Sequence, residues 1–246
     1  MSAWPSGENT PAIEVREVIK RFGAFFALRG ISLQIPAGEC LALFGPNGAG
    51  KTTFLRILSA LSRPSSGEIL IHGQALQQHS LAVRRQFGVI GHQTFLYDDL
   101  SAAENLLFYA RLYDLDSPRE RTRAALAEVG LEKRADDRVR AFSRGMQQRL
   151  AIARAMLHDP DLLFLDEPYT GLDQHAAMRL TSWLQKLRDR RRTILLVTHD
   201  LAQGLALADR VMIFVRGRAV WQERATQVQL PSLQTIYFDL VAQGGP

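Results

Sequence analysis

The sequence predicts an α/β fold that carries an inserted helical subdomain. On both sides of the insertion, short apolar runs alternate with helical patterns, as expected for a sheet covered by helices. From about residue 95 to 157 the strand signals disappear and apolar residues follow helical spacing. Hydrophobic residues make up 46% and charged residues 22% of the 246-residue chain, which is ordinary for a globular protein.

The N-terminal region predicts a polar leader over residues 1–11 and a folded chain from residue 12. The leader lacks the basic and apolar regions of a signal peptide, and no apolar run approaches the roughly 20 residues that span a bilayer. We therefore expect no membrane-spanning helix. The single cysteine, Cys40, lies in an apolar run, where we expect a buried thiol and no intrachain disulfide. A formal charge of +5 permits anionic partners without selecting one.

The elements of the core follow from apolar runs and the glycines that bound them. Two β-rich segments between residues 12 and 35 come first, and a helix is expected from about Gly50 to Leu61. The run 211–221 predicts a hairpin that turns at 216–218, and 222–246 a short C-terminal tail. Further strands are expected at 40–44, 67–73, 161–166 and 193–199.

The helical insertion carries two predicted N-terminal capping boxes. Ser101 and Glu104 have the required spacing ahead of an apolar helical stripe. Ser117 and Glu120 repeat it, and Pro118 occupies the first helical position, where proline is favoured. We therefore expect helices to begin after both serines.

The stretch "GPNGAGKTT" (45–53) matches G-x-x-x-x-G-K-[ST] between a predicted buried strand and a helix. Its glycines allow a tight loop whose backbone N–H groups surround phosphates. Lys51 places a positive charge on the β- and γ-phosphates, and the Thr52 hydroxyl suits Mg²⁺. The expected ATP-binding residues here are Gly45, Pro46, Asn47, Gly48, Ala49, Gly50, Lys51, Thr52 and Thr53.

Two carboxylates follow the apolar run "LLFL" at the carboxyl end of a predicted strand, where open parallel sheets bind ligands. We expect Asp166 to hold Mg²⁺ and Glu167 to act as the general base toward the attacking water. His199 ends another buried strand and is a candidate contact for the γ-phosphate. Gln93, at the junction with the helical subdomain, is a candidate ligand to Mg²⁺ or water.

A second candidate phosphate site lies in "FSRGMQQRL" (142–150), where a serine precedes a helix. This stretch completes an ordered set of motifs that resembles the ATP-binding cassette of ABC transporters over residues 12–221. The motifs are "GPNGAGKTT", Gln93, "FSRGMQQR", "LFLDEP", "TGLD" and "VTHD". The resemblance implies a P-loop NTPase fold with an antiparallel β subdomain and a helical subdomain at about 95–157.

The resemblance also implies roles for residues outside the P-loop. Ser143 and Gly145 would contact ATP bound to the other cassette of a head-to-tail dimer. Phe142, Arg144 and Met146 depart from the family consensus Leu-Ser-Gly-Gly-Gln. Two further roles are implied: adenine stacking by Phe22, for which a core phenylalanine is the alternative, and communication across the dimer by Asp173.

The partners implied by the resemblance are a second cassette, expected to be a copy of this chain, and an integral membrane permease. The chain would lie at the cytoplasmic face of the inner membrane and hydrolyse ATP with Mg²⁺. Three long stretches are similar to the haem-exporter cassette of bacterial cytochrome c maturation, and multidrug- or lipid-type exporter cassettes are the alternative. A non-transport ATPase acting on nucleic acid or cluster assembly is a further alternative. The basic run 188–192 could contact nucleic acid, but we interpret it as the solvated end of a helix, and no nucleic-acid partner is expected.

Overall fold

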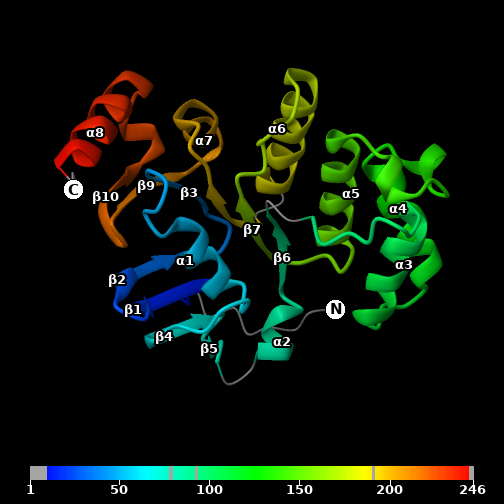
Figure 1. Cartoon of the computed structure of the whole chain (residues 1–246), viewed down its shortest axis with the longest axis horizontal. Coiled ribbons are helices and arrows are strands. Elements are labelled where there is room, and N and C mark those ends of the chain that lie inside the picture. The colour runs from blue at the N-terminus through cyan, green and yellow to red at the C-terminus, as the bar shows by residue number, and fades with distance from the viewer. Residues whose placement is uncertain (1–9, 78–79, 92–93, 190–191, 244–246) are drawn as a thin grey trace.

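The computed structural model describes residues 10–77, 80–91, 94–189 and 192–243. They form two sheets and a cluster of helices, with that cluster at one end of the molecule and the C-terminal helix at the other (Figure 1). The arrangement is the α/β fold with antiparallel and helical parts that the sequence predicts. Gln93 lies outside the described residues.

A six-stranded sheet in the order β10-β9-β3-β8-β7-β6 forms the centre of the fold. Five strands run parallel, and β10 pairs antiparallel with β9 at one edge. Strands β3, β7 and β8 are buried along their whole length, which explains their unbroken apolar runs in the sequence. The bounds are β3 (Cys40–Phe44), β6 (Phe87–Ile90), β7 (Leu162–Asp166), β8 (Thr193–Val197), β9 (Arg210–Val215) and β10 (Arg218–Arg224).

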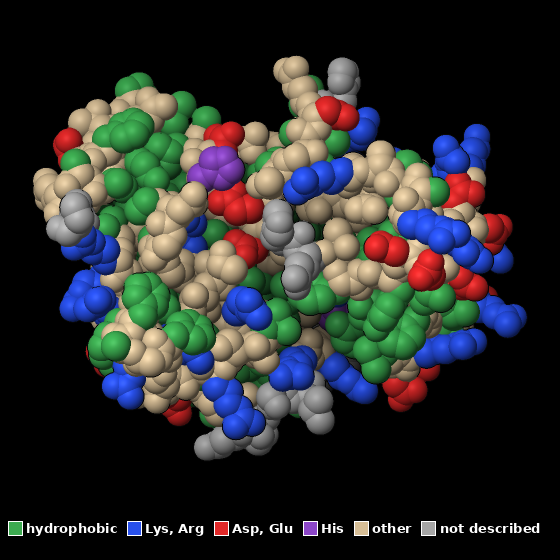
Figure 2. Space-filling view, viewed as in Figure 1, with side chains coloured by type: hydrophobic (Ala, Val, Ile, Leu, Met, Phe, Trp, Pro, Cys, Tyr) green, Lys and Arg blue, Asp and Glu red, His purple; other side chains and the backbone are tan. Residues whose placement is uncertain are grey.

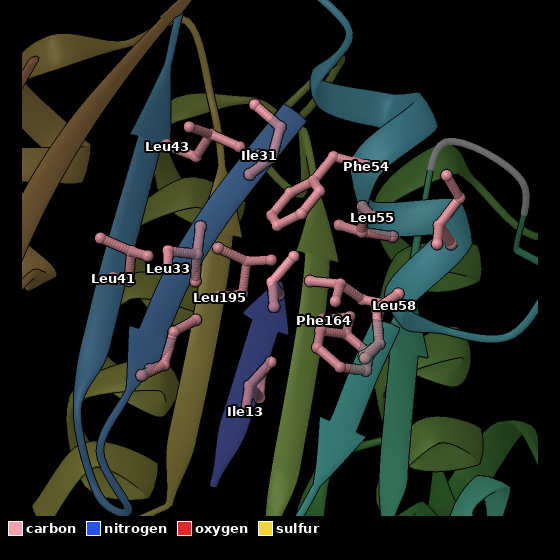
Figure 3. Packing of buried hydrophobic residues seen from close by; sticks show 14 of the residues in the cluster. Ile13, Ile31, Leu33, Leu41, Leu43, Phe54, Leu55, Leu58, Phe164 and Leu195 are labelled. Carbon is pink, nitrogen blue, oxygen red and sulfur yellow. The ribbon is translucent and has the colours of Figure 1, made fainter. Parts of the chain in front are cut away.

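An antiparallel sheet in the order β2-β1-β4-β5 packs beside it. Between the sheets lies α1 (Lys51–Leu58), whose Phe54, Leu55 and Leu58 point toward Phe164 and Leu195 of the central sheet (Figure 3). The strands of the antiparallel sheet are β1 (Ile13–Phe22), β2 (Phe25–Ile35), β4 (Ser66–Ile71) and β5 (Gln74–Ala75).

Helix α1 ends earlier than the sequence predicts. It stops at Leu58 because Ser59 caps it and Ala60 takes a positive φ of 55°, so Leu61 leaves the helix and is 49% exposed. The apolar spacing of Leu55, Leu58 and Leu61 therefore continues past the end of the helix.

The helical subdomain has its own core, formed where α3, α4 and α5 meet. Leu106, Leu126 and Leu150 are buried there, one from each helix. The bounds are α3 (Ala102–Leu112), α4 (Pro118–Glu128) and α5 (Arg144–Met156), with 3-10 turns η1 (Glu132–Arg134) and η2 (Val139–Ala141) between α4 and α5.

Only one of the two predicted capping boxes forms. Ser101 Oγ accepts from Glu104 N at 3.1 Å, and Glu104 Oε2 accepts from Ser101 N at 2.7 Å, so the first prediction is confirmed. Ser117 precedes α4 as predicted, but its φ of 51° is left-handed and its side chain makes no capping hydrogen bond. The second box is wrong because a side-chain cap needs an extended N-cap residue.

The remaining helices flank the central sheet. The C-terminal 25 residues, expected as a short tail, contain a helix that packs on β9 and buries Leu233. No helix in the described ranges is long and apolar enough to cross a membrane. The bounds are α2 (Ser80–Arg84), α6 (Gln174–Asp189), α7 (Leu201–Leu207), η3 (Ala225–Gln227) and α8 (Leu230–Gln243).

Candidate nucleotide site

The loop between β3 and α1 is shaped by glycines. Gly48 and Gly50 have positive φ of 79° and 97°, which L side chains rarely adopt. A Cβ on Gly45 would collide with the carbonyl of Phe214, and one on Gly50 with the carbonyl of Ala27. Gly50 precedes α1 without a side-chain cap, so the first N–H groups of the helix are left for an anion.

Lys51 extends from the first position of α1 back toward this loop. Its Nζ donates to the carbonyl oxygens of Gly45 at 2.6 Å and Pro46 at 3.0 Å, and the residue is 8% exposed. Desolvation lowers the pKa of Lys51, and the nearby charges of Glu167 and Asp166 oppose that shift. The ammonium group is thus held at the loop in a partly dehydrated site, where a phosphate would be a strong partner.

Two oxygen ligands suited to Mg²⁺ meet beside Lys51. Asp166 ends β7 and is 6% exposed, and its Oδ1 accepts from Thr52 Oγ1 at 3.3 Å. A carboxylate and a hydroxyl are oxygen ligands of the kind that Mg²⁺ takes in proteins alongside phosphate oxygens and water. The chemistry of this donor set therefore fits the metal that the sequence predicts.

Glu167 and His199 form a hydrogen-bonded pair at the same edge of the sheet. His199 Nδ1 donates to Glu167 Oε2 at 2.7 Å, and Glu167 N donates to the carbonyl of Val197 at 2.8 Å. Glu167 has a φ of 52°, a conformation that non-glycine residues adopt at an energetic cost, often at functional sites. The sequence indicated both residues but not this pairing, because nothing in the order of the motifs specifies side-chain contacts.

The second candidate phosphate site lies on the helical subdomain. Ser143 is exposed and precedes α5, and its Oγ accepts from Met146 N at 3.3 Å. In Figure 1, α5 lies on the opposite side of β7 from α1, the helix that follows the P-loop. Asp173 is likewise a helix cap, because its Oδ1 accepts from Ala176 N at 2.7 Å at the start of α6. Ser143 and Asp173 thus both cap helices, and capping a helix is compatible with the roles that the sequence predicts for them.

Phe22 is not a core residue. It ends β1 with 55% of its surface exposed, and Lys20 Nζ lies 4.9 Å from the centre of its ring. The core alternative is therefore wrong, and the ring is free to stack on a base.

A cleft of about 600 Å³ separates the helical subdomain from the core beside Glu167. Its walls include Arg144 and Gln148 of α5, Thr170 of the loop after β7, and Phe95 of the segment after β6. The general-base candidate and the start of α5 therefore share one cleft.

The sequence and fold match known proteins closely. Residues 28–170 match the family described as "ABC transporter". The chain is 38% identical over 213 residues to Nod factor export ATP-binding protein I of Cupriavidus metallidurans, covering 86% of this chain and 70% of the relative. It is also 38% identical over 201 residues to the ABC transporter ATP-binding protein NatA of Bacillus subtilis, covering 80% and 81%.

Solved structures agree with the sequence comparison. An ATP-binding subunit of an ABC transporter superposes with a TM-score of 0.84 and 31% identity, covering 93% of this chain and 99% of that one. A dimeric ATP-binding cassette in a post-hydrolysis state with ADP and Pi superposes with a TM-score of 0.79 and 28% identity, covering 87% and 98%. Family, relatives and fold agree with the P-loop geometry: the chain belongs to the ABC transporter family, as an ATP-binding cassette whose ATPase activity powers transport.

Proposed function

We propose that this chain drives a bacterial ABC exporter by closing with a second copy of itself around two ATP molecules. The observation that carries the proposal is the division of the site between two parts of the molecule. Lys51, Asp166 and the Glu167–His199 pair gather at the edge of the central sheet, whereas Ser143 lies on the helical subdomain. A partner cassette placed head-to-tail brings its serine to the γ-phosphate, and solved relatives are dimeric.

The chemistry that this arrangement supports is attack of water on the γ-phosphorus. Glu167 accepts a proton from the water as its oxygen bonds to phosphorus, and the bond to the β–γ bridging oxygen breaks to release ADP and phosphate. His199 orients the carboxylate through the 2.7 Å hydrogen bond. Lys51 stabilises the charge that develops on the phosphate oxygens. Thr52 and Asp166 would hold Mg²⁺, which neutralises phosphate charge when bound.

Removing the proton acceptor tests this assignment. We expect Glu167→Gln to bind ATP but to lose about 10²-fold or more of the ATPase kcat, because the amide cannot accept the proton. The closed dimer then persists, so size-exclusion chromatography with ATP should show a dimer for this variant and a monomer without nucleotide. Glu68→Gln, an exposed carboxylate on β4, is the matched control. A monomer for Glu167→Gln at saturating ATP would contradict the proposal.

The membrane partner would contact the helical subdomain. Figure 2 shows hydrophobic side chains gathered over α3, which carries the exposed Phe108 and Leu112. Phe95 and Tyr97, in the segment before α3, are exposed as well. Exposed aromatic residues beside a cleft are typical of a protein interface. We propose that this surface receives a cytoplasmic helix of the permease.

Nucleic acid is a weaker candidate for the partner. Arg188 of the basic run forms an ion pair with Asp209 at 2.8 Å, and Arg192 contacts Asp159 and the carbonyl of Pro160. Both arginines are thus engaged within the chain, which supports the interpretation of this run as the end of a helix.

Export, rather than import, is favoured by the names of relatives, several of which are Nod factor export ATP-binding proteins. The cargo stays a hypothesis. The haem-exporter assignment depends only on the three long stretches that are similar to that cassette. The relatives described above are named as a Nod factor export protein and as NatA. Haem staining of c-type cytochromes in cells that lack the protein tests it. Loss of covalent haem, restored by wild type but not by Glu167→Gln, supports haem export; unchanged staining leaves a multidrug- or lipid-type exporter.

A further inference from the structure

The loop that joins β7 to α6 is clamped by two side chains from the first turns of α5. Gln148 Nε2 donates to the carbonyl of Pro168 at 3.1 Å. Arg144 lies four residues earlier, on the same face of the helix, and packs against Gly171 of the same loop. The N-terminal end of α5 is therefore attached to this loop at two points.

The contact between Arg144 and Gly171 is close, and a side chain at position 171 would displace the guanidinium group from the loop. A Cβ built on Gly171 would lie 2.5 Å from Arg144 Nε and 2.6 Å from Cζ. Gly171 also has a φ of 75°, in the left-handed region. The flat guanidinium group thus lies directly against the loop backbone, a geometry that the round ammonium of lysine does not reproduce.

The clamped loop joins the general-base candidate to the start of α6. It begins at Glu167 and ends at Asp173, the cap of α6. Turn hydrogen bonds from Thr170 N to Glu167 O and from Leu172 N to Tyr169 O hold its shape. These bonds link the backbone of Glu167 to the part of the loop that lies beside Gly171.

Helix stability does not explain an arginine at the first position of α5. The positive end of the helix dipole lies there, and the first turn contains no acidic residue. A cation in that place is electrostatically unfavourable for the helix. Arg144 thus contributes little to the helix itself, and its guanidinium group lies against Gly171 in the wall of the cleft beside Glu167.

We propose that Arg144 is a positioning residue that couples the adjacent Ser143 to Glu167 through the clamped loop. The inference rests on the proposed function, because Ser143 must engage the ATP of a partner cassette. When that engagement displaces the start of α5, Arg144 transmits the movement to the loop and aligns Glu167 for its own ATP. The two ATP sites of the dimer are then cooperative.

Steady-state ATPase kinetics of the full chain test the coupling. We expect Arg144→Ala to lower kcat about tenfold and to reduce the Hill coefficient for ATP toward one, while binding of a fluorescent ATP analogue to the monomer changes less than about twofold. A purely structural role would not separate kcat and cooperativity from nucleotide binding. Arg140→Ala is the matched control, since Arg140 is an exposed arginine of the same subdomain that pairs only distantly with Asp99, at 3.4 Å.

A double-mutant cycle with Gly171→Ala locates the effect at the contact. In the wild-type background the added methyl group displaces the Arg144 side chain from the loop, so kcat should fall about tenfold; in the Arg144→Ala background the further loss should be about threefold or less. Equal losses in both backgrounds, or Arg144→Ala kinetics like those of Arg140→Ala, would overturn the inference and leave the proposed function intact. A wild-type chain without ATPase activity would overturn both.

Discussion

At the scale of single residues, the site depends on charges that the fold has partly removed from water. Lys51 is buried against two carbonyl oxygens, and desolvation lowers its pKa. Asp166 is also buried, beside the hydroxyl of Thr52. Charges in such places interact more strongly with a ligand than they would in bulk water. The P-loop therefore combines a preformed backbone shape with electrostatics that favour a bound polyphosphate.

Phe22 is the residue whose proposed role can be tested most directly. Its exposed ring costs little to remove, so Phe22→Ala should leave the free energy of unfolding within about 0.5 kcal/mol of wild type. Stacking on a base contributes about 1–3 kcal/mol, so the affinity for ATP should fall roughly 5- to 150-fold. Isothermal titration calorimetry with ATP checks this, with Phe25→Ala in the same hairpin as control. Equal affinity losses for the two variants would contradict a specific role for Phe22.

His158 predicts an acid-sensitive contact between the helical subdomain and β6 of the central sheet. Its Nε2 donates to the carbonyl of Phe87 at 3.2 Å and its ring stacks on Tyr113 with centroids 4.0 Å apart, so Nδ1 must accept a proton when the ring becomes charged. That atom is buried, and no hydrogen-bond partner for it is found among the described residues. Burial lowers the pKa of His158 from 6.5 to about 4.

The sign of the pH effect follows from that shift. Between pH 6.5 and 4 the unfolded chain binds more protons at this position than the folded chain does. The free energy of unfolding therefore decreases as the pH falls through this range, by about 3 kcal/mol at most. His158→Phe keeps the stacking but cannot be charged, so its free energy of unfolding should fall less steeply over that range. Urea denaturation at several pH values measures the difference, and identical slopes for both proteins would contradict it.

At the scale of elements, sequence patterns predict the presence of helices and strands better than their ends. The buried strands β3, β7 and β8 were predicted because a strand covered on both faces has an unbroken apolar run. The end of α1 and the cap of α4 were not, because they depend on the backbone conformations of Ala60 and Ser117. Both residues have positive φ, and nothing in the apolar pattern reports such a conformation.

The two serines that precede α3 and α4 offer a matched test of capping. Ser101→Ala removes one bond of a complete capping box and should reduce the free energy of unfolding by about 1 kcal/mol. Ser117→Ala removes no capping bond and should change it by less than about 0.5 kcal/mol. Urea denaturation followed by circular dichroism measures both. A larger loss for Ser117→Ala than for Ser101→Ala would contradict the assignment of the caps.

At the scale of the whole molecule, the candidate ligand-binding residues could be located from the sequence, whereas the contacts between them could not. The motifs indicate Lys51, Asp166, Glu167 and His199 as candidates, because each lies at or after the carboxyl end of a strand in the same parallel sheet. The sequence does not reveal that His199 bonds to Glu167, since side-chain orientations depend on how the strands are ordered and spaced. The packing of the C-terminal helix was missed for the same reason.

That C-terminal helix should contribute to the stability of the whole cassette. Leu233 of α8 is fully buried in a cluster with Phe44, the residue before the P-loop, and Ile213 of β9. Leu233→Ala leaves a cavity there and should reduce the free energy of unfolding by about 2–5 kcal/mol. The exposed neighbour Gln234→Ala should change it by less than about 0.5 kcal/mol. Denaturant titration compares the two; equal small losses would mean that α8 is separable from the cassette, and that the P-loop strand is stable without it.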